Sequence, residues 1–146
     1  MKQVLRISEA ASIAMHALIF LAEKKGESIS NTRIAEVFGI SANHSSKVMQ
    51  RLLKSGYVRA LRGPGGGYTL LAEPAKVSLL DICTTVDGEL DTSGCLFGRK
   101  KRCSLKKCLF SGLMSEADDL IVKHLGSVTL ADFIKDGFSF EGIVTK

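Results

Sequence analysis

The 146-residue sequence has only two prolines and no hydrophobic run long enough to cross a membrane. Scarce proline together with 45% hydrophobic residues excludes a disordered chain, because enough apolar surface is available to build a core. The longest apolar run, Ile13–Ala22, contains His16 and falls well short of the ~20 residues that a membrane-spanning helix needs. The length suits one compact domain, or a small domain with an added dimerisation element.

The features of a secretion signal are incomplete as well. Lys2 and Arg6 precede the apolar run as they would in a signal peptide, but Glu9 and His16 interrupt the pattern, and no small-residue cleavage site precedes the charged residues 23–25. We therefore expect a cytoplasmic protein with reduced thiols and no membrane partner. In that compartment, metal or redox chemistry explains clustered cysteines better than disulfides do.

The net charge of +5 is unevenly distributed. Residues 1–72 contain ten Lys and Arg against four Asp and Glu, whereas residues 73–146 contain ten against eleven. Six of the latter ten cations lie between Arg99 and Lys107. A basic N-terminal half favours a polyanionic partner, with nucleic acid as the first candidate, although ordinary surface lysines would give the same count.

Apolar residues at helical spacing predict three helices in the first 55 residues. The first runs from Ser8 to Lys25, and the second follows candidate caps within residues 28–31 and ends at Gly39. The third is capped by Ser41 and reaches about Ser55. Two short helices joined by a glycine-containing turn are typical of a helix-turn-helix. The apolar residues of the third helix expected to face inward are Val48, Leu52 and Leu53.

A glycine-rich loop follows the third helix. Residues 56–62 alternate apolar and cationic side chains, as a half-buried strand does, and Tyr68–Leu70 predicts a second strand beyond the loop Gly63–Gly67. A strand, glycine loop and strand after a recognition helix predict a wing, whose glycines let backbone N–H groups approach a phosphate or a groove wall. A nucleotide-binding loop is excluded, because neither GxGxxG spacing nor the Lys-Ser/Thr pair of a P-loop is present.

The second half predicts further helices around an irregular segment. A short amphipathic helix is expected between Val77 and Val86, a long helix from Leu105 to Leu125, and a short last helix at 129–134. Residues 87–104 have no periodicity, and a loop of that length in a compact domain is usually functional or disordered. The apolar residues expected to line one face of the long helix are Leu109, Leu113, Ala117, Leu120 and Leu125.

The four cysteines divide into one and three. Cys83 lies on the apolar face of its predicted helix, which favours a buried structural thiol. Cys95, Cys103 and Cys108 lie in or next to the irregular segment, among six Lys and Arg. That positive field lowers the pKa of a thiol and favours the thiolate, which binds metals and attacks oxidants.

Several chemistries fit three such thiolates. Structural zinc is a minority interpretation, because it prefers four ligands in closely spaced cysteine pairs. An iron–sulfur cluster also takes four ligands, but its fourth can come from another residue type and leave an exchangeable iron suited to sensing. A redox disulfide between Cys95 and Cys103 is a further alternative. Cysteines without a function are disfavoured, because exposed thiols in a basic loop are prone to oxidation.

The sequence resembles the Rrf-type winged-helix regulators, the family of the iron–sulfur sensors IscR and NsrR. The resemblance extends over almost the whole chain and is carried by Gly39-Ile40-Ser41, by Ser55-Gly56-Tyr57-Val58, by residues 58–68 (VRALRGPGGGY), and by the three-cysteine segment before a long helix. Asn43-His44 resembles the nitric-oxide sensor branch. The implied fold is mainly α with a small β-wing: a winged helix-turn-helix DNA-binding domain at 1–72, then a cluster-binding loop at about 88–108, a dimerisation helix at about 105–126 and a short C-terminal helix.

The resemblance implies that Cys95, Cys103 and Cys108 ligate an iron–sulfur cluster. Three cysteines are compatible with [2Fe–2S] and [4Fe–4S], and [2Fe–2S] is favoured. The position of the histidine ligand in IscR is Ser111 here, and the position of the aspartate that the partner subunit supplies in NsrR is Ser12. The fourth ligand is therefore open. Glu9 and His16 lie one turn on either side of Ser12 on the same helix face, and each is a candidate for it.

The resemblance further implies a homodimeric transcription regulator, with a repressor favoured, that binds a pseudo-palindromic operator in double-stranded DNA and responds to nitric oxide, redox state or iron–sulfur status. Two alternatives stay open: a cluster-free regulator of the same family under thiol or partner control, and a cysteine redox enzyme, although neither a paired base nor a C-x-x-C motif supports an enzyme. The residues expected to contact DNA are Ser41, Asn43, His44, Ser45, Lys47 and Arg51 of the recognition helix and Arg59, Arg62, Gly63, Pro64, Gly65, Gly66, Gly67 and Tyr68 of the wing.

Overall fold

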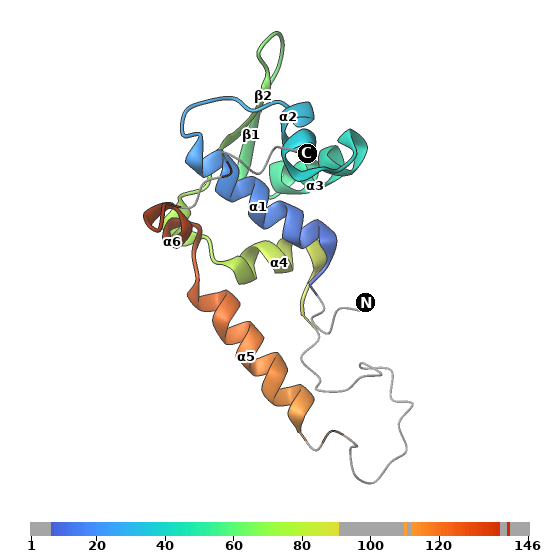
Figure 1. The fold of residues 1–146 in the computed structure, drawn as a ribbon, viewed down its shortest axis with the longest axis vertical. Coiled ribbons are helices and arrows are strands. Elements are labelled where there is room, and N and C mark those ends of the chain that lie inside the picture. Colours follow the sequence, from blue (N-terminus) through green and yellow to red (C-terminus); the bar gives the residue numbers. More distant parts are fainter. Residues whose placement is uncertain (1–6, 91–109, 111, 138–139, 141–146) are drawn as a thin grey trace.

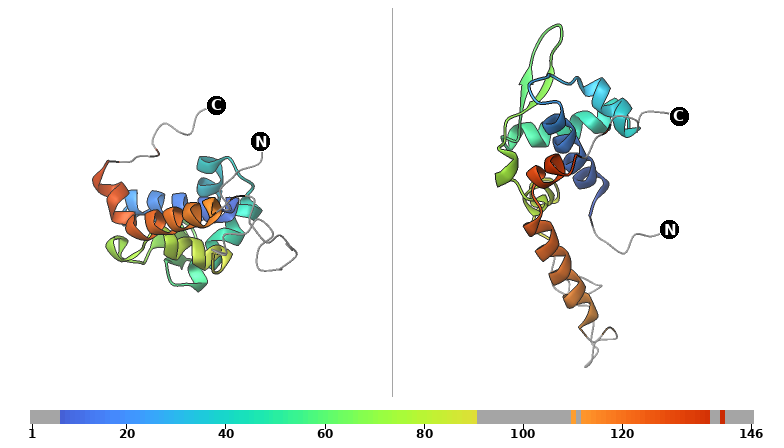
Figure 2. Two further views of the ribbon diagram at one scale, coloured as in Figure 1. Left: turned by 90° about the horizontal axis from the view of Figure 1, so that it is seen from below. Right: turned by 60° about the vertical axis from the view of Figure 1, so that its left-hand side comes forward.

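The computed structural model describes residues 7–90, 110, 112–137 and 140. A helical body carries a β-hairpin at one end and a single helix, α5, that extends from the other end (Figure 1). The right view of Figure 2 shows the same extension of α5 from a further direction. Within the described residues, none of the helices is long and apolar enough to cross a membrane. The fold is mainly helical with a two-stranded wing, as the sequence predicts.

Helix α1 (Glu9–Glu23) forms the centre of the core. The Ser8 side chain caps it by accepting a hydrogen bond from the backbone N–H of Ala11. Ten of its fifteen residues are buried. It packs against α3, α4 and α6, so the helices of the first 72 residues and those of the second half share one hydrophobic core.

The helix-turn-helix consists of α2 (Asn31–Phe38) and α3 (Ala42–Lys54). Gly39 ends α2 in the left-handed region at φ 62°, a conformation that glycine adopts without strain. The Ser41 hydroxyl then caps α3, as predicted, by accepting from the backbone N–H of His44. Val48 and Leu52 are buried as expected, but the prediction for Leu53 is wrong, because its side chain lies on the outer face and is 39% exposed.

The wing is an antiparallel hairpin of β1 (Val58–Leu61) and β2 (Gly67–Leu70), with Leu61 opposite Gly67. A backbone bridge between Ile29 and Tyr68 attaches β2 to the loop that precedes α2. The expected half-buried alternation holds only at Val58, while Leu61 is 44% exposed. The reason is visible in Figure 1, where the hairpin projects beyond the helical body.

In the second half, the short 3₁₀ helix η1 (Pro74–Lys76) leads to α4 (Leu79–Asp87), and α6 (Leu130–Lys135) follows α5. The residues before α4 and α6 pair with each other, since the N–H of Leu79 donates to Val128 and the N–H of Leu130 donates to Val77. Both helices therefore start from one backbone junction. Asp81 and Asp132 complete the capping of these helices by accepting from Ser78 and Thr129.

Helix α5 spans Leu113–Ser127. The prediction that it begins at Leu105 is wrong, because Gly112 precedes its first turn in the left-handed region at φ 89° and Phe110 lies in a turn. Of the predicted apolar face, Leu125 is buried, whereas Leu113 and Leu120 are 56% and 70% exposed. Leu109 lies outside the described residues.

Candidate nucleic-acid interface

The outer face of α3 presents polar side chains at helical spacing. Asn43 and Lys47 are exposed, and His44 is half-buried. Gln50 lies three residues beyond Lys47 and is also exposed, so it extends the same stripe. The prediction from sequence omitted Gln50, although the helical period from Asn43 through Lys47 would have found it.

Ser45 corrects the prediction for the recognition helix. Its side chain is fully buried at 0% exposure on the inner face of α3, and its hydroxyl has no hydrogen-bond partner within the described residues. A side chain in the core cannot reach a base edge. Position 45 falls between the outward positions 43 and 47, and the 100° rotation per residue turns it inward. Ser45 is therefore a core residue and not a DNA contact.

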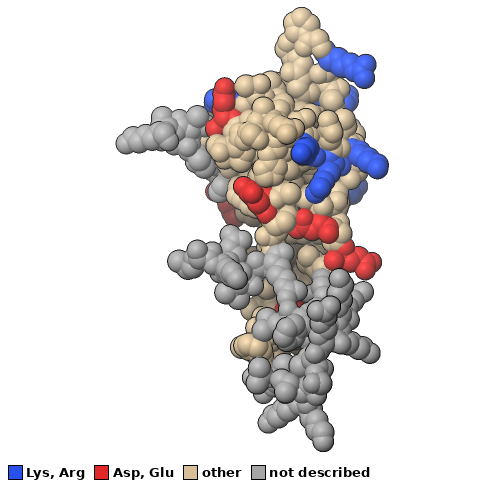
Figure 3. Space-filling view, turned by 90° about the vertical axis from the view of Figure 1, so that its right-hand side faces the viewer, with Lys and Arg blue, Asp and Glu red and all other residues tan. Residues whose placement is uncertain are grey.

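The cations of the wing are exposed on the same end of the molecule as α3. Arg59 lies in β1 opposite Thr69, and Arg62 begins the loop between the strands. In the space-filling view, Lys and Arg side chains gather on the upper part, with several Asp and Glu side chains below them (Figure 3). Gly63, Pro64 and Gly65 at the tip of the wing are exposed too.

Steric contacts inside the protein explain why positions 66 and 67 are glycine. A Cβ atom at Gly66 would lie 2.5 Å from the carbonyl oxygen of Leu61, and one at Gly67 would overlap the backbone of Ile29. Tyr68 is partly buried, and its backbone forms both bridge hydrogen bonds with Ile29. Gly67 and Tyr68 thus lie where the wing meets the body, whereas Gly66 allows the tight turn inside the hairpin.

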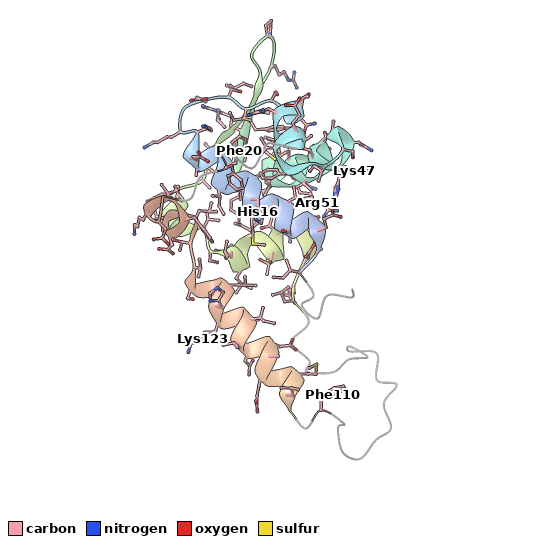
Figure 4. All side chains as sticks on the ribbon, viewed as in Figure 1. His16, Phe20, Lys47, Arg51, Phe110 and Lys123 are labelled. Carbon is pink, nitrogen blue, oxygen red and sulfur yellow. The ribbon has the colours of Figure 1, made fainter. Side chains whose placement is uncertain are left out.

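Arg51 is engaged within the chain. Its guanidinium Nη1 donates a hydrogen bond of 3.0 Å to the carbonyl oxygen of Val86 in the last turn of α4. Figure 4 shows Arg51 one turn from Lys47 on α3, next to the ends of α1 and α4. The structure thus gives Arg51 a partner that the sequence pattern did not indicate.

The candidate cluster ligands are only partly described. Cys95, Cys103, Cys108 and Ser111 lie outside the described residues. Among the described side chains, no group of three His, Cys, Asp or Glu is positioned to hold a metal ion. Cys83 is a free, buried thiol, as predicted. Burial first and the nearby Asp87 charge second raise the pKa of the Cys83 thiol, which keeps it protonated and unreactive.

Glu9 and His16 occupy different surroundings on α1. Glu9 is exposed in the first turn, directly after Ser8. His16 makes edge-on ring contacts with Phe38 and Phe140, and its Nδ1 lies 2.6 Å from the carbonyl oxygen of Ser12. Because a carbonyl only accepts, Nδ1 carries a proton, and Nε2 is the basic nitrogen of the neutral ring.

Residues 7–136 match the family model described as Rrf2, iron-dependent transcriptional regulator. The chain belongs to the Rrf2 family. Because this is a family of transcriptional regulators, the redox-enzyme alternative is excluded.

Individual relatives agree with the Rrf2 assignment. The transcriptional regulator NsrR of Bacillus subtilis is 29% identical over 134 residues, which cover 90% of this chain and 92% of the relative. The structure of CymR, the global cysteine regulator of B. subtilis, is similar with a TM-score of 0.72 at 25% identity, covering 91% of this chain and 98% of that one. IscR of T. potens gives a TM-score of 0.70 at 27% identity, covering 92% and 90%.

Proposed function

We propose that this Rrf2-family protein is a cytoplasmic homodimer, acting as a repressor, whose binding to a pseudo-palindromic operator is controlled by an iron–sulfur cluster. The observation that carries the DNA-binding part is the joint exposure of the α3 stripe and the wing cations at one end of the body. The similarity to an NsrR and an IscR supports the sensing part.

On DNA, α3 enters the major groove and the wing follows the backbone. Asn43 and Gln50 offer side-chain amides, which pair with adenine in the major groove, while Lys47 suits a phosphate. Arg59 and Arg62 contact the backbone or the minor groove beside α3. A two-fold dimer places its half-sites about one helical turn, ~34 Å, apart.

The exposed face of α5 supports the dimer. Leu113 and Leu120 lie seven residues apart, two turns along one side of the helix, and both are more than half exposed. Large apolar side chains in such a row favour burial against a second apolar surface. A second copy of α5 supplies that surface in the proposed homodimer.

The donor set fits an iron–sulfur cluster with one non-cysteine ligand. Cys95, Cys103 and Cys108 supply three thiolates, and Glu9 supplies a carboxylate on the surface. Glu9 follows Ser8, whose hydroxyl donates to Asp87 at the end of α4, so this carboxylate lies where the chain leaves α4 toward the cysteines. His16 stays the second candidate, two turns further along α1. When bound, such a cluster supplies an exchangeable iron that reacts with nitric oxide or oxidants.

The wing assignment is tested with Arg62→Ala. Removing one phosphate contact weakens operator binding and lowers the slope of log affinity against log salt by ~0.9. Fluorescence anisotropy with an operator duplex at several salt concentrations measures both quantities. Lys25→Ala, which removes an exposed cation beyond α1, is the matched control and leaves both unchanged. An Arg62→Ala protein with the affinity and slope of the wild type contradicts the assignment.

The cluster is tested with Cys103→Ala. Protein purified without oxygen loses its visible absorbance if Cys103 is a ligand, whereas Cys83→Ala retains it because that thiol is buried in the core. A brown, fully loaded Cys103→Ala protein removes Cys103 from the ligand set. Mössbauer spectra of the wild type distinguish [2Fe–2S] from [4Fe–4S], and titration with nitric oxide tests the signal.

A cluster-free regulator is the second candidate. The similarity to CymR, which is described as a cysteine regulator, favours it. In this case, control comes from the thiols or from a partner protein. A colourless wild-type protein from anaerobic purification that still binds its operator specifically would support this alternative over the cluster.

A further inference from the structure

The last turn of α4 is held by two other helices. Arg51 of α3 donates to the carbonyl oxygen of Val86 at 3.0 Å. Ser8, which caps α1, donates to the Asp87 carboxylate from its hydroxyl at 2.5 Å and from its backbone N–H at 3.3 Å. The end of α4 is therefore hydrogen-bonded both to α3 and to the residue that caps α1.

The Arg51 contact is favourable for a general reason. The last four carbonyl groups of a helix lack partners inside the helix, and they carry the negative end of its dipole. A guanidinium group satisfies the Val86 carbonyl and neutralises that end at once. The bond is partly buried, which shields it from solvent. Arg51 thus stabilises the end of one helix while belonging to another.

A second link runs parallel to it. Thr85 of α4 and Tyr57, which follows α3, are joined by a hydroxyl–hydroxyl hydrogen bond of 3.3 Å. Arg51 lies in the last turn of α3, and Tyr57 lies three residues after its end. Helix α4 is therefore connected to the end of α3 at two places. If the last turn of α4 moves, these two hydrogen bonds pull on the end of α3.

The chain leaves α4 at Gly88, whose φ of 83° ends the helix, and in the sequence the stretch with Cys95, Cys103 and Cys108 follows. We propose that Arg51 is a positioning residue: it fixes α3 to the last turn of α4 and transmits changes at that turn to the DNA-binding face. The regulatory part of this proposal rests on the proposed function, in which the cysteine-bearing stretch is the sensor.

The test separates positioning from direct DNA contact. Arg51→Ala and Lys47→Ala each remove one cation from α3, one turn apart, and Lys47 has no assigned partner in α4. For a positioning residue, Arg51→Ala weakens operator binding roughly fivefold or more while the salt slope stays that of the wild type. Lys47→Ala lowers the slope by ~0.9, the value of one phosphate contact. A slope reduced equally by Arg51→Ala would overturn the proposal.

Hydrogen exchange supplies a readout without DNA. Loss of the Arg51 contact frees the end of α4, so the Gly88 amide, which is bonded to Thr84, exchanges about tenfold faster. In Lys47→Ala it exchanges at the wild-type rate. Arg51→Lys keeps the charge, and partial rescue of protection and affinity is expected from it even if Arg51→Ala folds poorly. Unchanged protection in both Arg51 variants contradicts the link to α4.

The regulatory part is measured as a ratio of operator dissociation constants. Anaerobically purified protein is compared with the same protein after iron removal by a chelator. Arg51→Ala brings this ratio toward one, whereas Lys47→Ala changes both constants equally. A wild-type ratio of one overturns the proposed sensor and the regulatory part together, and the salt slope and exchange rates still decide whether Arg51 positions α3.

Discussion

Helices α1 and α5 both contain fifteen residues, yet ten residues of α1 are buried and only Leu125 of α5 is. Helix α1 is apolar on nearly every side and is surrounded by α3, α4 and α6. Helix α5 packs against α4, and its leucines Leu113 and Leu120 are exposed. Two helices of the same length thus differ in role: α1 forms the core, and α5 exposes leucines that the proposed dimer would bury.

The largest effect is expected from shortening a buried side chain of α1. Leu18→Ala removes a fully buried side chain and lowers the free energy of unfolding by about 2–5 kcal/mol. Leu53→Ala, at the exposed position on α3, costs less than about 1 kcal/mol. Urea unfolding followed by circular dichroism measures both. Equal losses for the two variants would show that Leu53 belongs to the core after all.

Helix α5 is tested with Leu120→Glu. A charge at this exposed leucine leaves the monomer folded but raises the dissociation constant of the proposed dimer at least tenfold, about 1.4 kcal/mol. Sedimentation equilibrium measures the constant, and circular dichroism checks the helix content. Lys123→Glu, also an exposed position of α5, is the charge-matched control. A variant that assembles like the wild type would separate α5 from the interface.

A smaller effect concerns the junction after α5. Hydrogen bonds from the Thr129 backbone and hydroxyl lower the pKa of Asp132. Because the folded pKa lies below the unfolded value of about 3.9, this carboxylate contributes stability above that pH and loses the contribution as the pH falls through the folded pKa. The melting-temperature difference between wild type and Asp132→Asn should shrink from pH 7 to pH 3. A constant difference would argue against the ionised cap.

The smallest change is expected at Ser45. Its buried hydroxyl is unpaired among the described residues, so Ser45→Ala leaves stability unchanged or raises it by up to about 1 kcal/mol. Operator affinity stays the same, in contrast to Lys47→Ala. Thermal unfolding and fluorescence anisotropy check the two statements. A loss of base specificity in Ser45→Ala would return this side chain to the interface.

Most of the fold was predictable because local signals agree with the packing. Ser8 and Ser41 each precede a helix and cap it, and Gly39 ends α2 as its position indicates. The prediction failed where local signals mislead. The leucines from 105 onward suggest one continuous helix, but Gly112 takes a left-handed conformation that sets the start at Leu113. Apolar character also does not establish burial, as Leu53 and Leu61 show.

The candidate DNA face was predictable as a region but not residue by residue. Residue type and spacing identified Lys47, Arg59 and Arg62 as exposed cations. They did not distinguish Ser45, which rotates into the core, or Arg51, whose partner lies 35 residues away on α4. A contact between distant segments depends on how helices pack, which spacing along one helix does not reveal. The three cysteines of the proposed cluster stay a prediction.

Gly66 and Gly67 of the wing have a consequence for mutational scanning. Alanine at position 66 would collide with the carbonyl oxygen of Leu61 and distort the turn of the hairpin, and alanine at position 67 would collide with the backbone of Ile29 and tilt the hairpin away from the loop before α2. Such variants would lose operator binding without having lost a single contact to the nucleic acid. In a screen that scores repression alone, they would be indistinguishable from variants of Arg62, and only the ionic-strength dependence of binding would tell a misplaced wing from a missing charge.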